Sequence, residues 1–502
     1  MISRTTFLVL NNPSDILTSS RSSTLNMIII LRQSAVYIFI AILLIYAWRD
    51  WFVSLCGLIL LTAIMGRLDF PQSLGGIQGL NTWNILLADI FLAWLVNRRR
   101  QGLVWDMPAH INVFLMLWLC VILVGWVRMM LDRSLLAHLT TADLISEQLI
   151  NTIKWPIAGL LLFDGCRTRH RIKLALATTL LLLALFAIQI VRYVPAAVVL
   201  EPGNLKARSN IGEDIGLNVN GASKMMSGVP WAMLAVIPLL KKRKYEFLMV
   251  GASLISFYAL ALTGGRSGYI ACGATLVLLC ILRWRRYLIL LPFMVLILPI
   301  VFPGATARML MGFGETDITG EEITNEYNVT AGRSEFWPYV IDKIGESPIF
   351  GFGREAMVRT GVQKTIEQEV SKWEAVPHPH CAYLEVLLDS GLIGFIIIIG
   401  LHAFIWVYAI SVFVDRTDPL YTAAGGVALA LLTGHLVSNM GGQYFYPDRI
   451  DVGCWCAIGV MLRVHFARIR LLAEANGALA AAAIYPTEDI AVSQTPVVWA
   501  KS

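Results

Sequence analysis

Long apolar runs constrain the fold of this chain more than any other feature. Runs of mostly apolar residues recur along most of its 502 residues, and roughly 20 helical residues cross the hydrocarbon core of a bilayer. Only 15% of the residues are charged, whereas soluble domains carry about 25%. The sequence therefore predicts an all-α, polytopic integral membrane protein.

Thirteen apolar runs are candidate transmembrane spans. Only Arg49 and Asp50 separate the first two, which are either two short spans or one broken element. We therefore expect about 12 transmembrane helices. The runs lie near residues 34–48, 51–66, 83–97, 110–130, 150–164, 172–193, 222–240, 246–263, 268–283, 287–303, 389–409, 420–438 and 452–466.

The distribution of lysine and arginine predicts the orientation. Basic clusters at 98–100, 167–173, 241–244 and 283–286 punctuate alternate connections, and such clusters stay in the cytoplasm. The C-terminal Arg463, Arg468 and Arg470 agree with this assignment. The other connections, near 194–221, 264–267, 304–388 and 439–451, then face the opposite side of the membrane. The net charge of +6 follows from this topology and requires no nucleic-acid partner.

This topology divides the chain into five parts. We predict a polar N-terminal lead-in (1–33), a first set of transmembrane helices (34–303) and a large, partly helical loop on the non-cytoplasmic side (304–388). A C-terminal set of transmembrane helices (389–470) and a disordered cytoplasmic tail (471–502) follow. Structureless loops longer than about 12–15 residues are usually functional or disordered, so the large loop is the first place to look for a site.

Three arginines are predicted at the non-cytoplasmic ends of these elements. Arg266 follows two glycines in "LTGGRSGY", Arg333 begins an amphipathic helix predicted to end at Gly345 or Pro348, and Arg449 lies in "YPDRID". Each has a simpler interpretation: a snorkelling side chain, a solvated helix start, or a pair with a neighbouring acid. The functional interpretation is an anion clamp, because a guanidinium is a rigid donor fork for phosphate oxygens.

Two histidines stand at the entrance of a membrane helix in "VPHPHCAYLEVLLDSGLIGF". The prolines favour an extended entry, so the helix is predicted to begin near Cys381 with His380 at about its N-cap. Glu385 and Asp389 then share one face. A metal site on His378, His380 and Cys381 is one alternative, but a closed site needs four ligands. A single imidazole acting as general base needs only a nearby hydroxyl, and we favour that interpretation for His380.

Further polar residues are candidates for contact with a sugar or a phosphate. Arg208, Asn220 and Lys224 lie in the predicted connection after residue 194, and His378 and Glu385 lie beside the predicted base. Inside the predicted spans, Asp89 and His435 are the ionisable residues nearest to mid-span. For these two a structural hydrogen bond is the preferred interpretation, although such residues are often functional.

The motifs around these residues resemble those of the O-antigen ligase and polymerase family. "PHCAYLEVLLDSGLIGF" is similar to its signature, a histidine before a helix with a Gly-x-x-Gly turn, here His380, Gly391 and Gly394. "GRSEFW", "ESPIFGFG" and "GGRSGY" resemble its other segments, and the resemblance covers about residues 200–460. Cys381 departs from the asparagine, serine or glutamine usual after the histidine, which puts acceptor preference in question.

The resemblance implies a multi-pass glycosyltransferase of the bacterial inner membrane. Such enzymes transfer a glycan from an undecaprenyl-diphosphate-linked donor to a hydroxyl on the periplasmic face, without a metal or another cofactor. It implies that His380 is the base and that Arg266, Arg333 and Arg449 bind the diphosphate.

The acceptor and the class of protein stay open at this stage. The acceptor is the lipid A core in a ligase, and a second lipid-linked repeat in an O-antigen or exopolysaccharide polymerase. A membrane transporter is the alternative of a different class. A proton-coupled carrier is expected to concentrate charge at mid-membrane, whereas this chain concentrates it at one face.

Overall fold

The computed structural model describes residues 13–67, 70, 79–136, 139–201, 206–313, 315–316, 322–323, 326–370, 376–442 and 445–484. Within these ranges the chain is helical apart from one antiparallel pair of two-residue strands, β1 (Glu315–Thr316) and β2 (Glu322–Ile323). The α-helices are α1 (Pro13–Ala47), α2 (Trp51–Leu61), α3 (Thr82–Arg100), α4 (Ala109–Leu131), α5 (Thr141–Ile145), α6 (Asn151–Gly165), α7 (Arg169–Tyr193), α8 (Ala197–Leu200), α9 (Asn210–Ile215), α10 (Val219–Ala235), α11 (Arg243–Thr263), α12 (Arg266–Leu282), α13 (Leu291–Val301), α14 (Pro303–Leu310), α15 (Glu326–Thr330), α16 (Arg333–Glu346), α17 (Ala356–Arg359), α18 (Val362–Glu369), α19 (Ala382–Val414), α20 (Pro419–Ser438) and α21 (Val452–Ile484). Short 3-10 or π turns are η1 (Ser134–Leu136), η2 (Ser146–Ile150), η3 (Lys206–Ser209), η4 (Ile237–Leu239), η5 (Arg285–Leu290) and η6 (Arg449–Asp451).

Within the described residues, 8 helices are long and apolar enough to cross a membrane. They lie in α1, α4, α7, α10, α11, α19, α20 and α21, and α2 and α12 are shorter apolar helices. The predicted all-α, polytopic class is therefore confirmed. The predicted spans at 83–97, 150–164 and 287–303 fall on α3, α6 and the η5–α13 stretch, which are outside that set. The number of about 12 spans stays a prediction.

The two ends of the helical region differ from the predicted boundaries. α1 begins at Pro13, inside the predicted lead-in, and α21 continues to Ile484, beyond the predicted start of the tail at residue 471. The alanine-rich stretch after residue 476 suits a helix, because alanine has the highest helix propensity. Residues 1–12 and 485–502 of these two predicted segments lie outside the described residues.

The chain breaks where Arg49 and Asp50 interrupt the first apolar stretch. α1 ends at Ala47 and α2 begins at Trp51, with the Asp50 carboxylate accepting a hydrogen bond of 3.1 Å from the Phe52 backbone N–H. A short polar side chain that satisfies a free N–H is a typical helix N-cap. The stretch is thus two separate helices.

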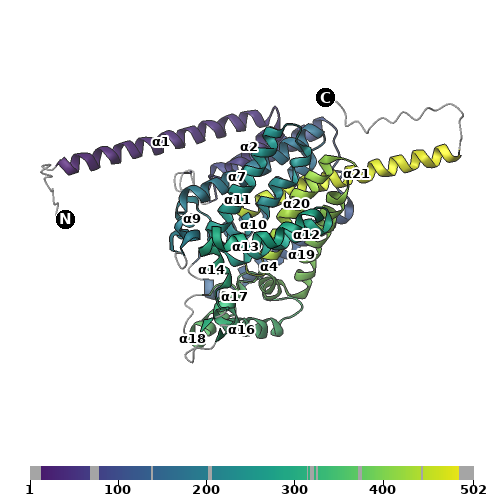
Figure 1. The fold of residues 1–502 in the computed structure, drawn as a ribbon. Helices are drawn as coiled ribbons and strands as arrows, with labels where there is room; N and C mark the ends of the chain where they lie inside the picture. The colour runs from purple at the N-terminus through teal and green to yellow at the C-terminus, as the bar shows by residue number, and fades with distance from the viewer. Residues whose placement is uncertain are drawn as a thin grey trace.

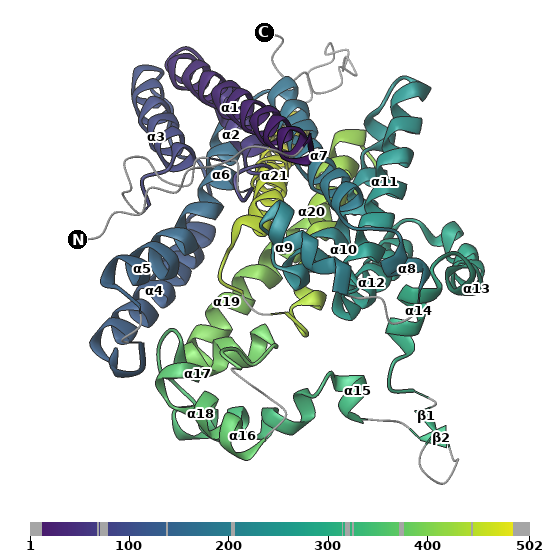
Figure 2. The same ribbon diagram turned by 90° about the vertical axis from the view of Figure 1, so that its left-hand side faces the viewer.

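α10, α20 and α21 form the centre of the bundle, whereas α1 and α4 are mostly exposed along their apolar lengths. Figures 1 and 2 agree in placing α16, α17 and α18 together at the end opposite the junction of α1 and α2. We call this the loop end of the bundle. It has its own small apolar core, in which Phe336 and Val340 of α16 pack with Ile366 of α18 and Leu388 of α19.

A break inside α19 connects the loop end to the membrane helices. Gly391 has φ 61° and ψ −166°, which is not helical. The Phe352 N–H donates to the Leu388 carbonyl (2.9 Å), and the Leu392 N–H donates to the Pro348 carbonyl (2.8 Å). A β-carbon on Gly351 would lie 2.5 Å from the Gly391 backbone nitrogen. The "PIFGFG" and "GLIG" motifs are therefore two halves of one joint, which requires glycine on both sides.

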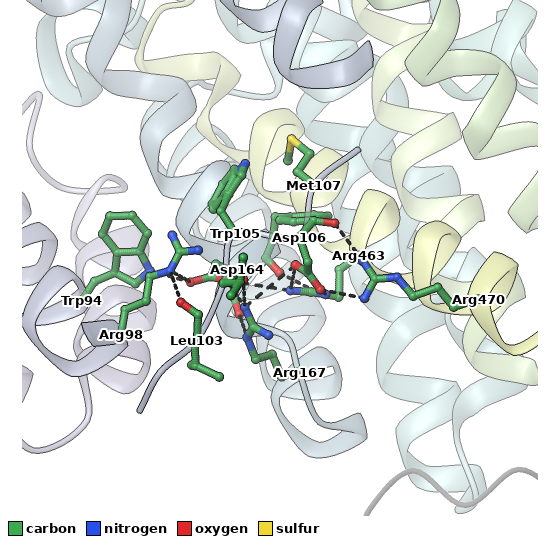
Figure 3. Close-up of polar contacts among 12 residues, drawn as sticks. Trp94, Arg98, Leu103, Trp105, Asp106, Met107, Asp164, Arg167, Arg463 and Arg470 are labelled. Carbon is green, nitrogen blue, oxygen red and sulfur yellow. Dashed lines mark hydrogen bonds and ion pairs between the residues drawn. The ribbon is translucent and has the colours of Figure 1, made fainter. Parts of the chain in front are cut away.

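Arginines that the charge pattern assigns to the cytoplasm gather around two carboxylates (Figure 3). Arg463 and Arg470 donate to Asp106 at 2.7 and 2.9 Å, while Arg167 and Arg98 pair with Asp164. Burial alone would raise the pKa of Asp106, but the hydrogen bond and charge of Arg463 dominate with those of its neighbours and lower that pKa to about 2. Segments far apart in the sequence thus meet in one charged cluster. This is expected if they all lie on the cytoplasmic side, as the charge pattern predicts.

The predicted orientation is tested by labelling single cysteines in an otherwise cysteine-free variant. Gln368→Cys at the end of α18 should react with a membrane-impermeant maleimide added to intact spheroplasts, because residues 304–388 are predicted to be periplasmic. Lys242→Cys, the control, should react only after the cells are opened. Both positions are exposed. If residue 368 is protected in spheroplasts and residue 242 is labelled, the predicted orientation is wrong and the opposite one holds.

Candidate functional site

His380 lies at the loop end, immediately before α19. The observed N-cap is Cys381, so His380 is one residue outside the position predicted for it. Its backbone is left-handed, with φ 52°, a conformation that costs a non-glycine residue about 1–3 kcal/mol. Trp337 of α16 donates to the Pro379 carbonyl at 2.9 Å, and Ala382 donates to the Asn439 carbonyl at 3.0 Å. These two bonds hold the strained residue from both sides.

Arg333 lies near enough to both His380 and Arg266 to interact with each of them electrostatically. Arg333 is the first residue of α16, and its guanidinium donates to the Gly441 carbonyl at 3.2 Å. Arg266, the first residue of α12, donates to the Asn328 carbonyl at 2.7 Å. The charge of Arg333 acts on both Arg266 and His380. The structure therefore brings Arg266, Arg333 and His380 together, although Arg266 and His380 are more than a hundred positions apart in the sequence.

Two further arginines add positive charge beside Arg266. Arg308 of α14 repels both Arg266 and Arg208, and Arg208 donates to the Gly264 carbonyl at 3.3 Å. Burial and then the charge of Arg308 lower the pKa of Arg208. Such mutual repulsion costs free energy, and an anion bound among the guanidinium groups would relieve it. We call Arg208, Arg266, Arg308 and Arg333 the arginine cluster.

The environment of both histidines favours the neutral imidazole. Burial, followed by the charge of Arg333, lowers the pKa of His380. Burial, followed by the charges of His380 and Arg354, lowers the pKa of His378 to about 4. A neutral ring can accept a proton, as a general base must. Among the described residues, no group of three His, Cys, Asp or Glu side chains is placed to hold a metal ion, and metal independence stays a prediction.

A buried ion pair lies beside the turn at residues 439–441. This turn accepts hydrogen bonds from Arg333 and from Ala382 of α19. Lys224 Nζ lies 3.2 Å from Asp451 Oδ1, and His435 Nδ1 lies 3.2 Å from the same oxygen. On the other side of the ring, His435 Nε2 lies 3.1 Å from Asn439 Nδ2. Asn439 then accepts from Ala382 through its backbone carbonyl. Lys224, predicted as a glycan contact, is thus engaged with Asp451, and His435 makes the structural hydrogen bonds expected of it.

Removing one partner of this ion pair should destabilise the protein. Asp451→Asn leaves the buried Lys224 ammonium without its counter-charge, which should cost on the order of 3–5 kcal/mol, seen as a lower Tm in detergent. The exposed pair Lys343–Glu346 is the control, since Glu346→Gln should cost less than about 1 kcal/mol. The double variant Lys224→Met/Asp451→Leu should recover much of the loss. An unchanged Tm in Asp451→Asn, with transfer lost in Lys224→Met, would instead favour the glycan-contact role.

The other predicted residues occupy different surroundings. Arg449 is buried, and its guanidinium donates to the Ile215 and Gly216 carbonyls at the turn before α10. Asn220 lies half-buried in the first turn of α10. Glu385 is buried with Oε1 3.7 Å from His378 Nδ1. Glu385 thus lies beside residues Pro377–His380, which we call the histidine stretch, and Arg449 is bonded to the helical bundle. Glycan contact by Glu385 and diphosphate binding by Arg449 stay predictions.

A second polar cluster, missed at the sequence level, lies beneath the histidine stretch. Arg354 is buried, with its guanidinium carbon 3.6 Å from the centre of the Tyr446 ring and a hydrogen bond from Nη2 to the Gln148 side-chain oxygen. Asp389 accepts from the Tyr446 hydroxyl (3.3 Å) and from the Ala356 N–H (3.2 Å). Arg354 directly follows the "GFG" segment that packs against the break in α19. This position beside two glycines is the only feature of the sequence that could have pointed to Arg354.

These helices and sites define a multi-pass membrane protein with a concentrated cationic and imidazole site at its loop end. Residues 251–399 match the family model described as O-Antigen ligase, and they include Arg266, Arg333 and His380. Over these residues the chain is similar to the O-antigen ligase family, and this match supports the resemblance inferred from the motifs.

Two curated relatives are similar to parts of the chain. One is the protein named "Putative polysaccharide ligase" of Rickettsia conorii, 22% identical over 184 residues, which cover 35% of this chain and 42% of that protein. The other is a protein of the same name from Rickettsia bellii, 28% identical over 109 residues, which cover 20% of this chain and 27% of that protein. The matches thus span less than half the length of either relative. They support a ligase-type function at a coarse level.

Proposed function

We propose that this protein transfers a glycan from an undecaprenyl-diphosphate-linked donor to an acceptor hydroxyl at the periplasmic face of the bacterial inner membrane, with the lipid A core as acceptor. The observation that carries the proposal is the juxtaposition of the half-buried His380, whose pKa is lowered by burial and by Arg333, with the arginine cluster. A diphosphate leaving group needs cations, and an attacking hydroxyl needs a base. Both are available at the loop end.

The reaction is a single displacement at the donor sugar. The acceptor hydroxyl oxygen forms a bond to the anomeric carbon while its proton passes to a ring nitrogen of His380. The bond between the anomeric carbon and the diphosphate oxygen breaks, and the polyprenyl diphosphate leaves with the electron pair. Arg266 and Arg333 stabilise the negative charge that develops there, an electrostatic effect that is often the largest in catalysis. No step in this scheme requires a metal ion.

A polymerase would use the same base and the same clamp with a different acceptor. The deciding experiment is deletion of the gene in its own host, followed by electrophoresis of lipopolysaccharide and of lipid-linked glycans. A ligase predicts that long glycans persist on the polyprenyl carrier and disappear from lipid A. Single repeats on lipid A would instead indicate an O-antigen polymerase. Loss of a secreted glycan, with lipopolysaccharide unchanged, would indicate an exopolysaccharide polymerase.

A further inference from the structure

A cavity of about 640 Å³ lies on the His378 side of the histidine stretch. Its walls come from η1 after α4, from η2, from α17–α18 and from Pro377–His378. Its volume is within the usual range of about 300–1,000 Å³ for small-molecule sites. The polar side chains on the described walls are Ser134, Gln148, Glu355, Gln363, Lys364, Glu367 and His378.

Hydrogen bonds fix one polar wall of the cavity. The Gln148 side-chain oxygen accepts from Arg354, and the Gln148 amide nitrogen donates to Glu355 Oε1 at 2.7 Å. Arg354 is itself held against Tyr446, and its Nε and Nη1 have no hydrogen-bond partner among the described residues. The side chains of Gln148 and Glu355 are therefore held in fixed conformations at the cavity wall. Less conformational entropy is then lost when a ligand binds.

The chemistry of the walls suits sugar hydroxyls better than a diphosphate. Amide and carboxylate groups can each exchange hydrogen bonds with hydroxyls, which both donate and accept. Leu135, Leu136 and Val358 supply apolar surface for the C–H faces of a sugar ring. Among the described lining residues, two glutamates outnumber the single lysine and there is no arginine. A dianionic diphosphate would be repelled here and attracted to the arginine cluster.

The cavity and the arginine cluster contact neighbouring parts of the histidine stretch. His378 lines the cavity, whereas His380 feels the charge of Arg333. Residues two apart in an extended chain are separated by roughly 7 Å, about the length of one sugar ring. A glycan in the cavity can therefore bring a terminal hydroxyl to His380 from the side away from the diphosphate.

We infer that this cavity binds the acceptor glycan through its neutral, hydroxyl-rich sugars, held by Gln148 and Glu355. The inference rests on the proposed function and adds the location of the second substrate. Donor and acceptor then approach His380 from opposite sides of the Pro377–His380 stretch. The large loop and the connection between α4 and α6 form the acceptor site together.

Steady-state kinetics in proteoliposomes tests the inference, with a synthetic undecaprenyl-diphosphate-linked glycan as donor and lipid A–core without O-antigen as acceptor. Glu355→Gln keeps the shape of the side chain but removes its charge, and Gln148→Ala removes the amide. Each should raise the KM for the acceptor by roughly tenfold, as expected for loss of about 1.4 kcal/mol. The KM for the donor should stay within about twofold. Ser134→Trp, at the exposed rim, should block the cavity and raise the acceptor KM further.

Glu346→Gln is the matched control, because Glu346 is an exposed glutamate of the same loop, and its kinetics should equal those of the wild type. Unchanged acceptor KM in all three cavity variants, or a change only in donor KM, would overturn the acceptor site while leaving glycan transfer intact. Absence of any transfer by the wild type would refute the proposed function itself. Thermal unfolding of each variant separates a binding defect from misfolding, and Ser134→Trp alters no hydrogen bond of the Gln148 wall.

Discussion

His380→Ala is expected to lower the rate of glycan transfer by on the order of 10²–10⁴-fold, the usual contribution of a general base. Binding of the lipid-linked donor should persist, because in the proposed mechanism the arginine cluster binds the diphosphate independently of the imidazole. The comparison is made with purified protein under single-turnover conditions. Thermal unfolding of His380→Ala separates loss of the base from misfolding.

His378→Ala is the control for this assignment. His378 lines the acceptor cavity and lies near Glu385, so its loss should leave clearly more transfer activity than loss of His380. The opposite order, with His378→Ala inactive and His380→Ala active, would move the base to His378.

The pH dependence follows from the lowered pKa of His380. The ring must be neutral to accept the proton, so activity falls as the pH drops through its pKa. Because burial and Arg333 lower this pKa, the loss should occur below pH 6.5, the region typical of an unperturbed histidine. Removing the charge in Arg333→Ala should shift the acid limb of the residual activity toward higher pH, whereas Arg333→Lys should shift it less.

Arg333→Ala and Arg266→Ala are each expected to reduce transfer by at least about 10²-fold, as for loss of one donor to a developing oxyanion. Arg→Lys at either position should impair transfer substantially, since lysine keeps the charge but loses the bidentate fork. The loss should appear as weaker donor binding together with a lower kcat.

Arg133→Ala is the matched control for the arginines. Arg133 lies in the α4–η1 connection and donates to the Thr141 hydroxyl at 2.9 Å, away from the arginine cluster. Its replacement should leave transfer near the wild-type rate. Wild-type activity in Arg333→Ala and Arg266→Ala would rule out the clamp.

Local patterns predicted the elements of the site well. The apolar spacing in α16 gave its start at Arg333 and its end near Glu346, because burial of Phe336 and Val340 follows helical periodicity. Ile341, at a predicted apolar position, is half exposed (53%). The charge break at Arg49–Asp50 likewise marked a real helix boundary, since an acidic N-cap is a local signal.

Long-range contacts could not be predicted in the same way. The break at Gly391 depends on a segment about forty positions earlier, and the helical propensity around it favours an uninterrupted helix. Lys224 and Arg449 resemble exposed polar residues at span ends. Their burial arises from Asp451 and from the carbonyls of Ile215 and Gly216, contacts that no sequence periodicity encodes. Arg308 and Arg354 were missed for the same reason.

Metal-independent glycan transfer with His380 as the base is tested most directly by a reconstituted assay with defined substrates. Purified protein in vesicles receives an undecaprenyl-diphosphate-linked glycan and lipid A–core, and the product is quantified by mass spectrometry in the presence and absence of EDTA. We expect glycosylated lipid A–core and free undecaprenyl diphosphate in equal amounts, undiminished by the chelator and lost in His380→Ala. Product formation that His380→Ala leaves unchanged, or that EDTA reversibly abolishes, would contradict this mechanism.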